Sequence, residues 1–237
     1  TGTTSIPEVG NKPSEGYTNS PLVDYVKISP NRTSPRNHKI DTITIHCVVG
    51  QCSVETLGNV FAPSSRQASS NYGIGYDGKI GMYVEEKDRS WCSSNASNDH
   101  RAITIEVASD TEHPYAVNDK AYAALIELLV DICKRNNIKE LKWKGDKSLI
   151  GQTDKQNMTV HRWFANKSCP GDFLYERHGA IADAVNKKLG VTTTTPSVPI
   201  VEETAKFPYL VKINTAVLNV RAGAGTNYKI KTIKINT

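Results

Sequence analysis

Short β-branched runs and longer amphipathic stretches occur in the same region of the chain, and this mixture constrains the fold more than any other feature. The runs TITIHCVV at 42–49 and AITIEVAS at 102–109 are rich in the isoleucine, valine and threonine that strands favour. Apolar residues recur at helical spacing over 118–137, with Asn118 as the N-cap, and residues 172–189 form a second amphipathic pattern. The sequence therefore predicts an α/β domain with one mixed central β-sheet flanked by helices.

Local signals predict two further features between these runs. Ser53 is a favourable N-cap for a short helix over 53–62. Two apolar segments within 71–86 flank the pair Asp77-Gly78, and this pattern is typical of a β-hairpin. We expect both features to belong to the same domain as the long runs.

Composition divides the chain into four parts. Residues 1–20 are polar and rich in Gly, Pro, Ser and Thr, which predicts an N-terminal linker or tail. Residues 190–205 contain a threonine run followed by prolines, which predicts an extended tether. These limits predict one domain at 21–189, which is large enough to be an enzyme, and a short C-terminal piece at 206–237.

The bulk properties exclude several classes of protein. No apolar stretch approaches the roughly 18 residues that a membrane span needs, so we expect no membrane span. The net charge of +5 is spread along the chain, which favours an anionic polymer such as a bacterial wall over nucleic acid. The chain begins without methionine or a signal-type run, and we expect a mature or trimmed product. The 5 cysteines form no disulfide framework, although a Cys47–Cys52 bond stays open.

The sharpest local signal is the segment from His161 to Cys169-Pro-Gly. A histidine at the end of the short strand 158–161, followed by a cysteine in a tight turn, suits a loop that folds back onto a metal ion. His46, at the end of the first strand, is a natural third ligand, and three protein ligands indicate a catalytic zinc site. Two alternatives stay open. The histidines are satisfied polar groups, or an unnamed fourth ligand closes a structural zinc site.

The order of motifs along the chain resembles a known family. His46, Tyr72, Glu106, His161 and the Cys169-Pro-Gly turn follow one another as in the N-acetylmuramoyl-L-alanine amidases of the type-2 amidase family, which includes peptidoglycan-recognition proteins. The resemblance implies that fold, with Zn²⁺ held by His46, His161 and Cys169. It also implies hydrolysis of the amide bond between N-acetylmuramic acid and L-alanine. A cysteine at this position accompanies hydrolytic activity in the family, so an enzyme is favoured over a protein that only binds muropeptides.

The resemblance also suggests catalytic roles for three residues. Glu106 is the candidate general base, and strand alternation places it on the same face as Thr104. Lys167 is a candidate donor to the developing oxyanion, and Tyr72 is a candidate for the same role or for orienting water. Surface positions for Glu106 and Lys167 are the alternatives.

Substrate contacts are predicted less directly. The chain departs from the usual family pattern at Asn71 and Cys92, where histidines are common, and this puts the substrate contacts in doubt. Cys47 is expected to point away from the zinc, because it follows His46 on the same strand. The candidates for lining a glycan–peptide groove are Arg66, Asn71, Trp91, Asn95 and Asn98.

The C-terminal piece resembles the opening of a bacterial SH3-type wall-binding module. The segment AVLNVRAGAGTNY at 216–228 carries this resemblance, and the module is expected to be partial. A tether and a binding module would raise the local concentration of a catalytic domain at an insoluble substrate. We therefore expect a monomeric protein that acts on bacterial peptidoglycan, as a secreted autolysin of the cell wall or as a phage or prophage endolysin.

Overall fold

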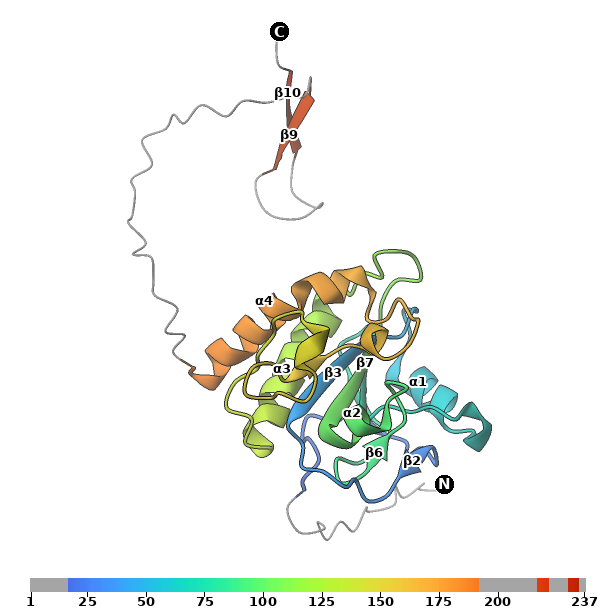
Figure 1. Ribbon diagram of the computed structural model, residues 1–237. Coiled ribbons are helices and arrows are strands. Elements are labelled where there is room, and N and C mark those ends of the chain that lie inside the picture. Colours follow the sequence, from blue (N-terminus) through green and yellow to red (C-terminus); the bar gives the residue numbers. More distant parts are fainter. Residues whose placement is uncertain (1–16, 192–216, 222–229, 235–237) are drawn as a thin grey trace, which may run out of the picture. The chain divides into compact units, whose positions relative to one another are not determined.

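The computed structural model describes residues 17–191, 217–221 and 230–234 (Figure 1). The chain divides into two compact units, Thr1–Thr192 and Thr193–Thr237. None of the helices in the described part of the chain combines the length and the apolar character needed to cross a bilayer. All five cysteines are free thiols.

A six-stranded mixed sheet forms the centre of the first unit, with the strand order β1-β5-β4-β7-β3-β8. The pairs β4–β7, β7–β3 and β3–β8 are parallel, whereas β5 pairs antiparallel with β4 and parallel with β1. This arrangement is the mixed central sheet that the sequence predicts. The strands are β1 (Tyr25–Val26), β3 (Thr42–Cys47), β4 (Tyr72–Ile74), β5 (Ile80–Met82), β7 (Ala102–Val107) and β8 (Met158–Thr159).

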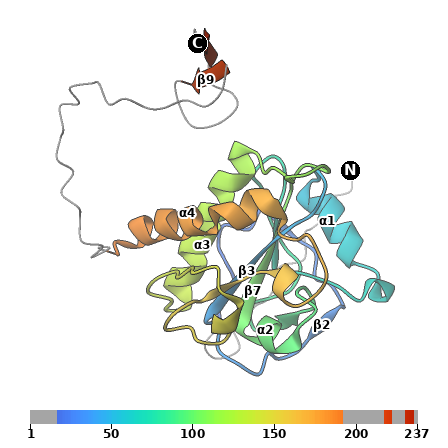
Figure 2. The same ribbon diagram turned by 45° about the horizontal axis from the view of Figure 1, so that its top comes forward.

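Two long helices cover one face of the sheet. Figure 2 shows α3 (Asp119–Arg135) and α4 (Gly171–Leu189) lying next to each other along the same side of the strands. Ile45 of β3 and Ile105 of β7 are fully buried in the apolar cluster beneath these helices. Each such side chain contributes roughly 1.5–3 kcal/mol on burial. A shift of one residue in the register of either strand would put polar side chains into this core. Burial of the isoleucines therefore also fixes which residues lie on the opposite face of the sheet.

The predicted caps and turn are confirmed. The Ser53 side chain accepts a hydrogen bond from Thr56 N at the start of α1 (Val54–Phe61), and Asn118 caps α3 in the same way. Asp77 and Gly78 lie in the turn between β4 and β5. Gly78 has φ +88°, a left-handed conformation that favours glycine.

The second face of the sheet carries a polar layer. The Thr44 and Thr159 hydroxyls lie 2.7 Å apart, and so do those of Ser90 and Thr104. A short helix and a two-stranded ribbon lie over this face, and the sequence analysis singled out neither of them. These elements are α2 (Ala96–Arg101), β2 (Arg32–Thr33) and β6 (Arg89–Ser90). Two further 3₁₀ turns are η1 (Ser64–Arg66) and η2 (Lys147–Leu149).

The last residues of the expected N-terminal tail belong to this domain. The Tyr17 hydroxyl donates to His38 O at 3.3 Å, and Ser20 N donates to the Tyr72 hydroxyl at 2.9 Å. Ser20 is buried, because its backbone closes a polar contact inside the domain. The predicted limit at residue 20 is therefore placed too late. Residues 1–16 lie outside the described part of the chain.

The second unit is described only in two strands, β9 (Val217–Arg221) and β10 (Ile230–Lys234), which pair antiparallel. The predicted tether at 190–205 lies outside the described residues, apart from its first two positions. The glycine-rich part of the SH3-type resemblance, at 222–229, also lies outside them. The partial module therefore stays a prediction.

Candidate active site

A histidine and a glutamate stand side by side where two parallel strands end. His46 of β3 and Glu106 of β7 are register partners in the sheet, so their side chains leave it on the same face. The alternation that predicts Glu106 opposite the apolar core is confirmed, because Ile105 and Val107 lie in that core. His46 is fully buried on the polar side.

His161 and Cys169 meet His46 at this edge. One donor atom from each of the three residues lies within 4.8 Å of the others. The His46 Nδ1 is 3.3 Å from the Cys169 Sγ, and the ring centroids of His46 and His161 are 5.2 Å apart. His46 lies 123 positions before Cys169 in the sequence, and the fold brings it to the other two residues.

The segment between His161 and Cys169 folds back as the spacing predicts. His161 begins the 3₁₀ helix η3 (His161–Trp163) directly after β8, and Cys169 precedes α4. Arg162 N donates to Cys169 O at 3.1 Å, and the Arg162 guanidinium contacts the Asp172 carboxylate at 3.0 Å. These contacts hold the two ends of the loop next to each other.

The electrostatics of the cluster suit a cation. Burial, followed by the neighbouring His161 and His178, lowers the pKa of His46 to about 3. Burial also lowers the pKa of His161. Both imidazoles are therefore neutral near pH 7 and keep a lone pair for a ligand. Two imidazole nitrogens and one sulfur form a donor set that zinc prefers, so the residues present fit that ion.

Glu106 is a buried carboxylate with one unused oxygen. Its Oε1 accepts a weak hydrogen bond from the Cys92 Sγ at 3.8 Å, whereas Oε2 is buried without a partner among the described residues. Burial raises the pKa of Glu106 to about 8, and the nearby Cys47 thiol adds to this effect. A buried unpaired carboxylate is costly and is a common sign of function.

A cavity of about 430 Å³ opens beside this carboxylate. Glu106, His161 and Lys167 lie on its wall, so the cavity connects the candidate chemistry with solvent. Arg89 also lines it, and the sequence analysis did not single out that residue. Three groove candidates complete this part of the lining: Arg66, Trp91 and Asn95.

Comparison with known proteins identifies the family of the chain. Residues 36–172 match the family model described as N-acetylmuramoyl-L-alanine amidase. The chain belongs to this family. Its enzyme class is therefore N-acetylmuramoyl-L-alanine amidase, and peptidoglycan is the substrate that fits the family.

Solved structures share the fold of this amidase. A mutant endolysin from Bacillus subtilis is 18% identical, with a TM-score of 0.51, and the match covers 69% of this chain and 99% of that chain. A selenomethionine derivative of AmpD is 20% identical, with a TM-score of 0.50, over 71% of this chain and 97% of that chain. PlyL is 16% identical, with a TM-score of 0.51, over 69% and 96%. No curated protein matches the chain.

Tyr72 does not belong to the active site of the amidase. Its register partner in β7 is Ile105, so its ring lies in the apolar core on the opposite face from Glu106. Its hydroxyl donates to Glu86 Oε1 at 2.7 Å and accepts from Ser20 N at 2.9 Å. The expectation of a catalytic Tyr72 is therefore wrong, because the hydroxyl is used inside the fold.

A Tyr72→Phe variant tests whether the Tyr72 hydroxyl serves the fold and not catalysis. We expect kcat/KM to stay within about twofold of the wild type, while the free energy of unfolding falls by about 1–3 kcal/mol, because Ser20 N and Glu86 lose a buried partner. Urea denaturation and a turbidity assay on cell walls measure the two quantities. A large loss of activity at unchanged stability would contradict the assignment.

Two further groove candidates are structural. Asn71 Nδ2 donates to Val84 O at 3.2 Å, and Asn71 Oδ1 accepts from Thr104 N at 3.2 Å. Asn98 Nδ2 donates to the Thr44 hydroxyl at 3.0 Å, and its Oδ1 accepts from Thr159 at 2.8 Å. Both amides are buried and satisfy groups of the polar layer, so the prediction that they contact substrate is wrong.

The remaining groove candidates line the cavity, and they differ in whether the side chain also makes a structural hydrogen bond. Arg66 is exposed. Trp91 is half-buried, and its Nε1 donates to the Thr33 hydroxyl at 2.9 Å. Asn95 caps α2 by accepting from Asn98 N at 2.9 Å. Only Arg66 is therefore free of a structural contact among these three.

Cys47 lies closer to the site than strand alternation suggests. It belongs to the apolar core, as predicted, but Cys169 packs against the edge of that core. The neighbouring Cys47 thiol, together with burial, raises the pKa of Cys169 well above its usual value. No signal in the sequence indicates the contact, because it depends on where α4 begins relative to β3.

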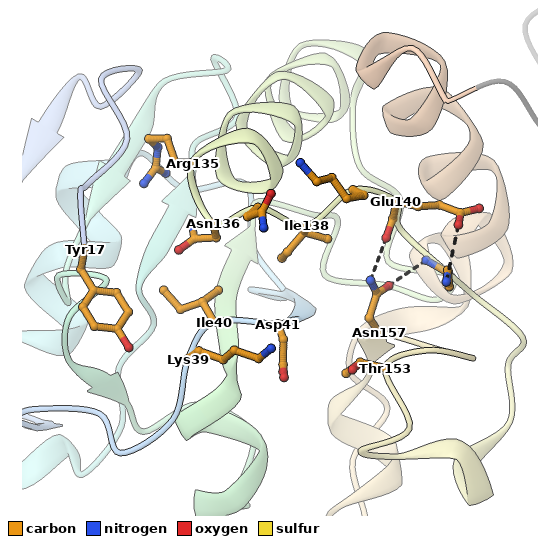
Figure 3. Close-up of a pocket in the computed structure, with 13 residues that line it drawn as sticks. Tyr17, Lys39, Ile40, Asp41, Arg135, Asn136, Ile138, Glu140, Thr153 and Asn157 are labelled. Atoms are coloured by element: carbon orange, nitrogen blue, oxygen red, sulfur yellow. Dashed lines mark hydrogen bonds and ion pairs between the residues drawn. The ribbon is translucent and has the colours of Figure 1, made fainter.

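The larger of the two described cavities is not at this site. It has a volume of about 670 Å³ and lies near Ile40, just before β3, and Asn136, at the end of α3 (Figure 3). Its lining includes none of the candidate zinc ligands and not Glu106. The candidate zinc ligands, and not the size of a cavity, therefore identify the proposed active site.

Proposed function

We propose that the protein is a zinc-dependent amidase that hydrolyses the bond between N-acetylmuramic acid and L-alanine in peptidoglycan. His46, His161 and Cys169 would hold the zinc ion, and Glu106 would act as the general base. The observation that carries the proposal is the set of three donor atoms within 4.8 Å of one another. The unpartnered Glu106 Oε2 beside the same residues supports it.

A bound zinc ion would supply Lewis-acid chemistry by polarising the scissile carbonyl and by making water a stronger nucleophile. The neutral imidazoles of His46 and His161 are ready to bind without losing a proton. Cys169 would bind as the thiolate, so its proton leaves when the cation enters. This set leaves room for water and substrate, because it contains only three protein donors.

Glu106 would move the proton during the reaction. Its Oε2 accepts a proton from the attacking water and later passes it to the departing amine of L-alanine. In the metal-free protein the pKa of Glu106 is about 8, which favours the protonated form near neutral pH. A divalent cation nearby would lower that pKa, so the carboxylate becomes available as a base when the site is loaded.

Lys167 is the remaining candidate for charge stabilisation. It is exposed, and it lines the cavity together with Glu106 and His161. Its ammonium group would donate to the negative charge that develops on the carbonyl oxygen. Arg66 and Arg89 make the cavity cationic, and we propose that Trp91 and Asn95 contact the glycan and peptide there.

The proposed site of action is the bacterial wall. The family acts on peptidoglycan, and a secreted autolysin or an endolysin would both carry out this reaction. We propose that residues 206–237 are part of an SH3-type wall-binding module, which the antiparallel pair β9 and β10 supports. All residues proposed to take part in cleavage lie in the first unit.

Mass spectrometry of digested peptidoglycan tests the function. We expect new L-alanine N-termini and expect glycan strands to lose their stem peptides. After EDTA dialysis the rate should fall by about a hundredfold or more, because zinc provides several kcal/mol of transition-state stabilisation, and added Zn²⁺ should restore it. Full activity in a protein shown to contain no metal would overturn the zinc proposal. Binding to the wall without new N-termini would leave a recognition protein.

A further inference from the structure

Three consecutive residues contact three different members of the proposed active site. The Cys92 Sγ donates to Glu106 Oε1 at 3.8 Å. The Ser93 Oγ lies 3.3 Å from the Nε2 of His46. The Ser94 Oγ lies 3.0 Å from the Nε2 of His161. We propose that the segment 92–94 positions the zinc ligands and the general base, an inference that rests on the proposed function.

The segment is itself held firmly by α2. The Asp99 Oδ2 accepts hydrogen bonds from Cys92 N and Ser93 N, both at 3.0 Å. Asn98 Nδ2 donates to the Ser93 Oγ at 3.3 Å. Ser94 has φ +57°, a left-handed conformation that turns the chain between the two histidines. The contacts to the site are therefore set by the fold and not by free surface side chains.

The two serines hold the Nε2 of each imidazole, which leaves Nδ1 for a metal ion. A neutral imidazole has one N–H and one bare nitrogen, and a metal ion takes the bare one. The His46 Nδ1 faces the Cys169 Sγ at 3.3 Å, so the Nε2 proton is directed to Ser93. Ser94 occupies the Nε2 of His161 and leaves Nδ1 free. Groups that hold the second nitrogen of a ligand histidine fix both its tautomer and its orientation.

The two serines differ in burial, so their removal should affect zinc binding to different extents. Ser93 is fully buried, so water cannot replace its hydroxyl when it is removed. Ser94 is exposed, so water can take over its contact with His161. Ser93 should therefore matter far more for zinc binding than Ser94.

Cys92 has a separate role from the serines. Its thiol faces the Glu106 side chain and donates to the carboxylate at 3.8 Å. This contact holds Oε1 and leaves Oε2 free for proton transfer. Cys92 should therefore influence turnover without influencing zinc binding.

Zinc affinity in the full chain tests the serines, measured by competition with a chromophoric chelator. We expect Ser93→Ala to weaken zinc binding about ten- to a hundredfold and Ser94→Ala about two- to threefold. Ser97→Ala is the matched control, since Ser97 is an exposed serine on α2. Thermal unfolding of the metal-free variants shows whether the fold is kept. Zinc affinity of Ser93→Ala within twofold of the wild type would overturn the inference, as would a loss of zinc explained by an unfolded metal-free protein.

Turnover tests Cys92. We expect Cys92→Ala to lower kcat about three- to tenfold, with KM and zinc affinity unchanged, and Cys92→Ser to restore kcat because its hydroxyl also donates. Equal kcat in Cys92→Ala and the wild type would overturn the role of Cys92. A wild-type protein that binds no zinc would instead overturn the proposed function, so the two failures are distinguishable.

Discussion

Replacing Cys169 with alanine should abolish zinc binding and reduce amidase activity by about a thousandfold or more. Cys169 provides the only sulfur in the three-residue donor set, and two imidazoles alone hold zinc weakly. Loss of the ion removes several kcal/mol of transition-state stabilisation, and each 1.36 kcal/mol is a tenfold change in rate. Metal analysis of the purified variant and release of stem peptides from cell walls measure the two effects.

Cys52→Ala provides the control for the loss of a thiol. Cys52 is half-buried like Cys169, but it packs against α1 and is not one of the three candidate zinc ligands. We expect this variant to keep its zinc and its activity. The role of Cys169 would be disproved by a Cys169→Ala protein that retains one zinc ion and wild-type turnover.

Replacing Glu106 with glutamine should reduce kcat by about 10²- to 10⁴-fold while zinc stays bound, because general acid–base catalysis contributes that much. Glutamine has nearly the same shape and keeps an acceptor for the Cys92 thiol. It cannot take a proton from water. Steady-state kinetics on soluble muropeptides, together with metal analysis, separate a catalytic defect from a binding defect.

The same variant should show a pH-dependent gain in stability when metal is absent. The pKa of Glu106 is about 8 in the fold against an ordinary value of 4.5, so the folded state binds a proton that the unfolded state has released. The stability of the wild type therefore falls as pH rises from about 4.5 to about 8. Glutamine does not titrate, so its relative gain grows over this window to the order of 5 kcal/mol.

Urea denaturation of the metal-free proteins at several pH values measures this gain. Glu176→Gln is the control, because Glu176 is exposed on α4 and its replacement removes a carboxylate without changing the buried site. A stability difference between Glu106→Gln and the wild type that stays constant from pH 5 to pH 9 would contradict the burial of a titrating carboxylate.

Much of the fold could be read from the sequence because its signals are local. The β-branched runs around His46 and Glu106 became β3 and β7, and Ser53 and Asn118 cap helices as expected. The pattern of apolar and polar positions in each strand also fixes which side chains share a face. It was enough to place Glu106 opposite the core.

The errors at Tyr72 and Asn71 share one physical cause. A short strand such as β4 is buried on both faces, so its pattern does not reveal which side chains face the site. Its register with β7 sets Tyr72 against Ile105, and a shift of one residue would have set it against Glu106. Hydrogen bonds between distant segments, not local propensity, decide that register.

Helix and strand periodicity and capping are short-range effects, so local patterns predicted the main strands and helices, the strand-end position of His46 and the candidate donors His161 and Cys169. Tertiary structure alone decided that the three donors come within 4.8 Å of one another. It also decided that Ser93 and Ser94 reach the two histidines. These contacts join residues far apart in the chain, and their geometry follows from how the sheet, α2 and α4 pack together, which no local pattern encodes.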